Sequence, residues 1–98
     1  MGVPVDVIQL LVSGAALAKA GRWYGSDLYS TGNNAVDVVL YDNASAASGT
    51  IIGGGRSQVG SSVRVGPRDG NFVQVKSGIY VSVTGTAPVV DTHYSQSA

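Results

Sequence analysis

The feature that most constrains the fold of this chain is a regular rhythm of short, β-prone runs separated by turn signals. From Gly21 onward, runs of roughly four to eight residues lie between clusters of Gly, Ser, Asn and Pro. Within the runs, apolar and polar residues alternate, which is typical of strands that bury one face. The expected strands cover residues 22–30, 35–41, 50–52, 59–65, 72–76, 79–84 and 89–94.

One strand about every 8–12 residues predicts a small antiparallel β-sandwich of seven or eight strands. The spacing leaves the strand order open between a jelly roll and an immunoglobulin-like arrangement. Composition favours the same class, because Val, Gly, Ser and Thr make up nearly half of the 98 residues and Glu is absent. Strong helix formers are therefore scarce, and a chain of this length is expected to form one domain.

The first 20 residues differ from the rest because residues 3–12 form an apolar stretch, with Pro4, Asp6 and Gln9 inside it. Residues 3–12 read as a strand or an extended arm, and the Ala-rich residues 13–20 as a helical turn or a loop. We therefore predict an N-terminal arm over residues 1–20 and a sandwich domain over residues 21–98. The arm is the expected assembly interface, through Val3, Val5, Val7, Ile8, Leu10 and Leu11.

Motifs that carry catalysis or bind cofactors are weak in this sequence. Residues 55–62 are one residue away from a P-loop, but Ser61 stands where the phosphate-binding lysine is required. His93 is the single histidine, and we interpret it as a surface or interface residue. With no Glu, a carboxylate pair would have to come from aspartates such as Asp37 and Asp42. We expect neither an enzyme nor a cofactor or metal site.

Charge and cysteine content limit the kinds of partner and site that the sequence supports. The formal net charge is zero, so a nucleic-acid partner is not expected, and no cysteine is present to form a disulfide or zinc finger. No run of about 18 apolar residues exists, which excludes a membrane-spanning helix. Residues 1–50 sum to −2 and residues 51–98 to +2. This division indicates either head-to-tail contact between copies or a chance distribution of solvated charges.

Aromatic residues supply a second candidate surface. Trp23 and Tyr24 are adjacent, so on a strand they point to opposite faces. One ring would belong to the core, and the other would be presented to a sugar ring or a partner protein. The remaining aromatic residues are spread over the expected strands, as core layers are: Tyr29, Tyr41, Phe72, Tyr80 and Tyr94.

An ordered series of short motifs resembles a known group of proteins. The motifs are Gly21-Arg22-Trp23-Tyr24-Gly25, Tyr29-Ser30-Thr31-Gly32, residues 36–42 with Ser48-Gly49-Thr50, and residues 76–85. Across about residues 20–94, this order is similar to that of small virion proteins of tailed bacteriophages. Such proteins include β-sandwich decoration (cement) proteins of capsids and components of tails or fibres.

The resemblance implies a structural protein of the virion, most specifically a decoration protein on the capsid exterior. Its partners would be the major capsid protein or another virion protein, and further copies of itself in a homo-oligomer such as a trimer. A subunit of the tail or fibre base is the alternative within this class. A glycan-binding sandwich module, with Trp23 or Tyr24 as platform, is the alternative from another class.

Overall fold

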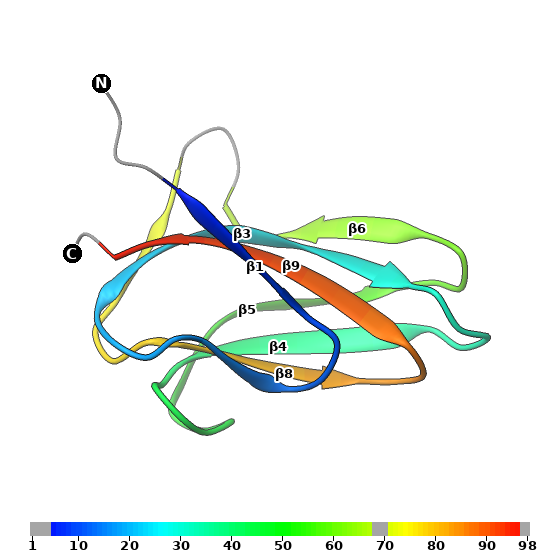
Figure 1. Ribbon diagram of the computed structural model, residues 1–98, viewed down its shortest axis with the longest axis horizontal. Helices are drawn as coiled ribbons and strands as arrows, with labels where there is room; N and C mark the ends of the chain where they lie inside the picture. The colour runs from blue at the N-terminus through cyan, green and yellow to red at the C-terminus, as the bar shows by residue number, and fades with distance from the viewer. Residues whose placement is uncertain (1–4, 68–70, 97–98) are drawn as a thin grey trace.

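The computed structural model describes residues 5–67 and 71–96, which form nine β-strands and no helix (Figure 1). The strands are β1 (Asp6–Leu10), β2 (Gly14–Leu17), β3 (Gly21–Ser30), β4 (Val36–Asp42), β5 (Thr50–Ser57), β6 (Ser62–Val65), β7 (Val73–Val75), β8 (Ile79–Thr84) and β9 (Pro88–Ser95). They make two antiparallel sheets packed as a sandwich, so the predicted fold class is confirmed.

The two sheets divide the strands as follows. Sheet A has the order β1-β9-β3-β6, with β7 paired to the start of β3, and sheet B has the order β2-β8-β4-β5. The chain changes sheet at every connection except those from β4 to β5 and from β6 to β7. As a result, β1 and β2 form the two sheet edges on one side of the sandwich, and β5 and β6 lie at the other side (Figure 1).

The N-terminal segment is part of both sheets, which corrects its interpretation as an arm outside the sandwich. β1 pairs with β9 over its whole length, and β2 pairs with β8. Ile8 and Leu10 pack against the core, and Leu17 lies within it. The Ala-rich residues form a strand because Ala16 and Leu17 supply small and aliphatic side chains to the space between the sheets.

The strand expected at residues 50–52 is longer than the sequence indicated. It does not end at residues 53–55, because β5 continues through all three glycines and pairs with β4 up to Ser57. The short segment Ser77-Gly78 crosses from β7 in sheet A to β8 in sheet B.

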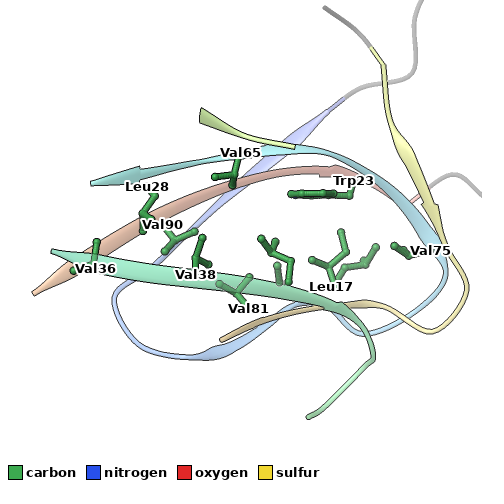
Figure 2. Close-up of a cluster of buried hydrophobic side chains, with 12 residues drawn as sticks. Leu17, Trp23, Leu28, Val36, Val38, Val65, Val75, Val81 and Val90 are labelled. Atoms are coloured by element: carbon green, nitrogen blue, oxygen red, sulfur yellow. The ribbon is translucent and has the colours of Figure 1, made fainter. Parts of the chain in front are cut away.

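The core fills the space between the sheets with aliphatic side chains and a single indole (Figure 2). Its members are Ala16, Leu17, Trp23, Leu28, Val36, Val38, Leu40, Val65, Val75, Ile79, Val81 and Val90. Both sheets contribute, with Trp23, Leu28 and Val90 from sheet A facing Val38 and Val81 from sheet B (Figure 2). The alternation of buried and half-buried residues along β3 and β4 produces this facing arrangement.

The Trp23 indole occupies space that two glycines leave open. A Cβ atom at Gly53 would lie 2.8 Å from Trp23 Cζ3, and one at Gly66 would lie 2.7 Å from Cζ2. These separations are far inside van der Waals contact, so a side chain at either position would displace the ring. Gly53 of β5 and Gly66 in the turn after β6 are therefore explained by the packing of Trp23.

A bulge in β3 allows the indole nitrogen to find a partner. The β3–β9 register shifts between Trp23 and Ser26, and Gly25 adopts a φ of 105° there. The extra residue turns both Trp23 and Ser26 toward the core, although three positions separate them. Trp23 Nε1 donates to Ser26 Oγ at 3.1 Å, and Ser26 Oγ lies 3.0 Å from Thr92 Oγ1. The buried polar atoms thus form a connected chain between β3 and β9.

The crossing from β7 to β8 is held by the carboxylate at the end of β4. Asp42 accepts hydrogen bonds from the backbone N–H groups of Lys76 and Ser77, with a longer one from Gly78 at 3.4 Å. Burial raises the pKa of the Asp42 carboxyl, but these donors and the Lys76 charge lower it by more, so it lies below its ordinary value. The carboxylate therefore fixes a sheet-to-sheet crossing in its ionised form.

We expect Gly53→Ala to destabilise the fold by about 1–3 kcal/mol, because the new methyl group would overlap the Trp23 ring. Gly14→Ala is the matched control, since its Cβ would meet only Leu10 Cδ2 at 3.9 Å. Urea unfolding of the two variants measures the difference. Equal stability of both variants would show that Trp23 does not need the space at Gly53.

We expect Asp42→Ala to lower the free energy of unfolding by about 1–3 kcal/mol at pH 7, because three backbone donors lose a charged acceptor. Since the folded-state pKa of Asp42 lies below the unfolded value of about 3.9, the wild-type advantage is complete above about pH 5. It shrinks as the pH falls through 3.9 toward the folded pKa. Urea unfolding between pH 2 and 7 measures this.

Asp37→Ala is the control for Asp42→Ala. Asp37 lies on the same strand, but it forms only an exposed ion pair with Arg56. Asp37→Ala should lower the free energy of unfolding by less than Asp42→Ala does, since exposed ion pairs contribute little to stability. A larger loss for Asp37→Ala than for Asp42→Ala would contradict the proposed role of Asp42.

Candidate interaction surface

Exposed aliphatic side chains concentrate on β1 and on the turn that follows it. Val5, Val7, Leu11 and Val12 are 44%, 55%, 59% and 71% exposed, respectively. Four of the seven large apolar residues that are exposed in the described chain therefore fall within eight consecutive residues. We call Val5, Val7, Leu11 and Val12 the aliphatic edge.

The structure divides the predicted assembly residues into two groups. Val5, Val7 and Leu11 are exposed, whereas Ile8 and Leu10 are half-buried and pack against the core. Val3 lies outside the described residues. The period of two along β1 explains the division, because successive side chains point to opposite faces of sheet A. Only the outward-facing group is free to contact a partner.

Beside the aliphatic edge, the outer face of sheet A carries a polar row that crosses four strands. The register places Gln9 opposite Asp91, Asp91 opposite Asp27, and Asp27 opposite Arg64. Two carboxylates thus face each other on neighbouring strands, an arrangement that is unfavourable without compensation.

Each of these carboxylates has its own hydrogen-bonding partners. Asp91 accepts from Gln9 Nε2 at 3.0 Å and from the Tyr29 hydroxyl at 3.1 Å. Asp27 Oδ2 lies 3.3 Å from Arg64 Nη1 and 3.2 Å from His93 Nε2. The predicted surface histidine therefore contacts the acidic pair. No signal in the sequence indicated this contact, because it depends on the pairing of β3 with β9.

The structure also places the two adjacent aromatic residues, Trp23 and Tyr24, on opposite faces of β3. Trp23 has no exposed surface, so of the two adjacent rings it is the one in the core and cannot be the platform for a ligand: the bulge of β3 and the glycines around the ring place it there. Tyr24 is half-buried on the opposite face, with its ring 5.8 Å from that of Phe72. Arg22 stacks on the Phe72 ring at 4.4 Å.

Phe72 was assigned to the core from the sequence, but 43% of its surface is exposed. It lies just before the three-residue strand β7, and β7 pairs only with the start of β3. The spacing of aromatic residues along the chain carried no signal for this position. With Tyr24 and Arg22, Phe72 forms a second exposed patch on sheet A.

The opposite charges of the two halves of the chain meet within the molecule. Asp37 forms a two-pronged ion pair with Arg56, at 2.8 and 3.1 Å. Arg56 lowers the pKa of the Asp37 carboxyl below its ordinary value. Asp27, from the first half of the chain, likewise pairs with Arg64 from the second half. Two of the cations available for head-to-tail contact between copies are thus engaged inside one copy.

Within residues 5–67 and 71–96, no cluster of His and Asp side chains has the arrangement of a metal site, and no pocket is present. The same part of the chain contains no helix that is long and apolar enough to cross a membrane. The P-loop-like residues 55–62 belong to the end of β5 and the turn into β6. Comparison with protein-family models, with curated proteins and with solved structures finds no match for this chain.

The Asp91 carboxylate, by its hydrogen bond and its charge, raises the pKa of Tyr29 above the ordinary value of 10.0. We expect Asp91→Asn to move the Tyr29 pKa back toward 10, because the phenolate no longer forms beside a negative charge. Titration of the tyrosine Cζ signals by carbon NMR, with Tyr29→Phe to assign the signal, measures this. Asp37→Asn in sheet B should leave it unchanged, and an unchanged pKa in Asp91→Asn would refute the contact.

Proposed function

We propose that this chain is a structural assembly protein, and most specifically a decoration protein on the capsid exterior of a tailed bacteriophage. The observation that carries the proposal is the aliphatic edge: four exposed aliphatic side chains on and beside a strand at the margin of the sandwich. A concentration of exposed apolar side chains of this kind is typical of sites where proteins associate.

The motifs of the phage virion resemblance coincide with residues on which the sandwich depends. Trp23 is the indole of the core, and Gly25 allows the bulge beside it. Asp42 holds the crossing at Ser77 and Gly78, and a Cβ at Gly78 would lie 3.0 Å from the Cα of Ala44. The resemblance is thus a resemblance in the scaffold, which supports a shared fold more directly than a shared partner.

Weak contacts repeated over a shell suffice for such a role. Full burial of an exposed Val or Leu side chain contributes roughly 1.5–3 kcal/mol before the costs of association. A few such side chains per copy would give modest affinity for one neighbour, and many copies on one particle would raise it through avidity. The proposed function therefore requires binding surfaces and a stable scaffold, with no catalysis.

A glycan-binding module is the second candidate, and the patch of Arg22, Tyr24 and Phe72 favours it. Partly exposed rings beside a guanidinium group offer a stacking surface for a sugar and a donor for its hydroxyl groups. A subunit of the tail or fibre base would use the same aliphatic edge as a decoration protein. Copy number in the particle separates these roles.

We expect hundreds of copies of this chain in each purified virion of the encoding phage, measured by quantitative mass spectrometry against the major capsid protein. Such a number supports the shell or a long tail tube, and labelling the particles for electron microscopy separates these two. A handful of copies would overturn the decoration role in favour of the tail tip or fibre base. No copies would overturn the virion proposal, and binding to a glycan array that Phe72→Ala abolishes would then support the second candidate.

A further inference from the structure

β1 differs from the other edge strands of the sandwich. β2 and β5 each pair with their neighbour through a shifted register, which bends an edge and discourages further pairing. β6 has four residues and carries Arg64, and β7 has three residues. β1 has five residues, an unbroken register with β9 and no Lys, Arg or Pro. Its outer edge therefore has the fewest features that natural sheets use against edge-to-edge contact.

The sequence of β1 fits a second copy of itself in antiparallel orientation. The strand covers residues 6–10, so full pairing of two copies is centred on Ile8. In that register, Val7 of one copy lies opposite Gln9 of the other, and Val5 lies opposite Leu11. All of these side chains belong to the outward-facing row or continue it, so the aliphatic edges of the two copies would adjoin each other.

The charge of β1 selects this orientation. Asp6, the only charged residue of the strand, stands at its first position. Antiparallel pairing centred on Ile8 places Asp6 opposite Leu10, with the two aspartates at opposite ends of the paired strands. Parallel pairing would place the two aspartates side by side, which is unfavourable. A second copy related by a two-fold axis therefore fits the outer edge of β1, because it covers the apolar row and keeps the two Asp6 carboxylates apart.

We propose that β1 pairs antiparallel with β1 of a second copy, joining the two A sheets into one continuous sheet across a two-fold dimer. The proposal deepens the proposed function, because it names a further copy of the chain as the partner of the aliphatic edge. It replaces the trimer expected from the resemblance with a two-fold contact, in which Gln9 at the end of the polar row of each copy lies opposite Val7 of the other.

Sedimentation of the full chain over a range of concentrations tests the proposal, with a dimer of twice 9.9 kDa as the expected species. Val7→Lys should raise the dissociation constant by about 100-fold, because a symmetric contact loses the valine twice and gains two like charges. Val59→Lys is the matched control, since Val59 is 52% exposed but lies between β5 and β6 at the other side of the sandwich. It should leave the dissociation constant unchanged.

Spin labels test the orientation and register. The chain has no cysteine, so Gln9→Cys and Asp6→Cys each give one label per copy, at exposed positions. With strands about 4.8 Å apart and a rise of about 3.3 Å per residue, the two Cα atoms at position 9 would be about 8 Å apart, and those at position 6 about 14 Å. Dipolar broadening should be strong for the first variant and weaker for the second.

A monomer at all concentrations would overturn the proposal, as would a dimer that Val59→Lys dissociates and Val7→Lys does not. Equal broadening at positions 6 and 9 would also overturn it, in favour of parallel pairing. Circular dichroism and melting of each variant confirm that it is folded before association is measured. These results do not depend on virions: a dimer absent from virions would refute the proposed function alone, whereas a monomer abundant in virions would refute the dimer alone.

Discussion

The structure depends on the accommodation of one indole ring between two sheets. Trp23 lies where β3, β5 and the turn after β6 come together, and its ring fills the volume left by Gly53 and Gly66. The ring can enter the core with its nitrogen satisfied only because the bulge at Gly25 brings Ser26 to the same face. One packing requirement thus explains a glycine in an edge strand, a turn glycine and a bulge that are far apart in the sequence.

The residues on which the expected resemblance to phage virion proteins rests are also ones that the packing of the sandwich requires. Gly21, Trp23 and Gly25 belong to the strand that carries the ring, and Asp42 connects to the segment that begins at Lys76. Residues of this kind would recur in any protein that buries a tryptophan ring in the same way. Such a resemblance therefore concerns the scaffold, whereas function depends on the surface that the scaffold leaves exposed.

The sequence predicted the fold class because alternation and turn residues act locally, within a few positions. It did not predict the place of β2, the continuation of β5 or which of Trp23 and Tyr24 is buried, because each depends on a partner distant in the chain. Val65, for example, needs the space at Gly55, where a Cβ would lie 2.5 Å from its Cγ1. For the same reason the sequence predicted only part of the candidate surface. It identified the apolar residues, but which of them face outward depends on how β1 pairs with β9.

The two faces of β1 show how a short segment can serve folding and association together. Its inward residues Ile8 and Leu10 attach the strand to the core, while Val5 and Val7 remain exposed on the other face. An arm that is free before assembly must lose conformational entropy when it binds. A strand that is already paired with β9 has lost that entropy on folding, so its outer edge is preorganised for a partner. The aliphatic edge is therefore better suited to association as part of the sandwich than it would be as a flexible arm.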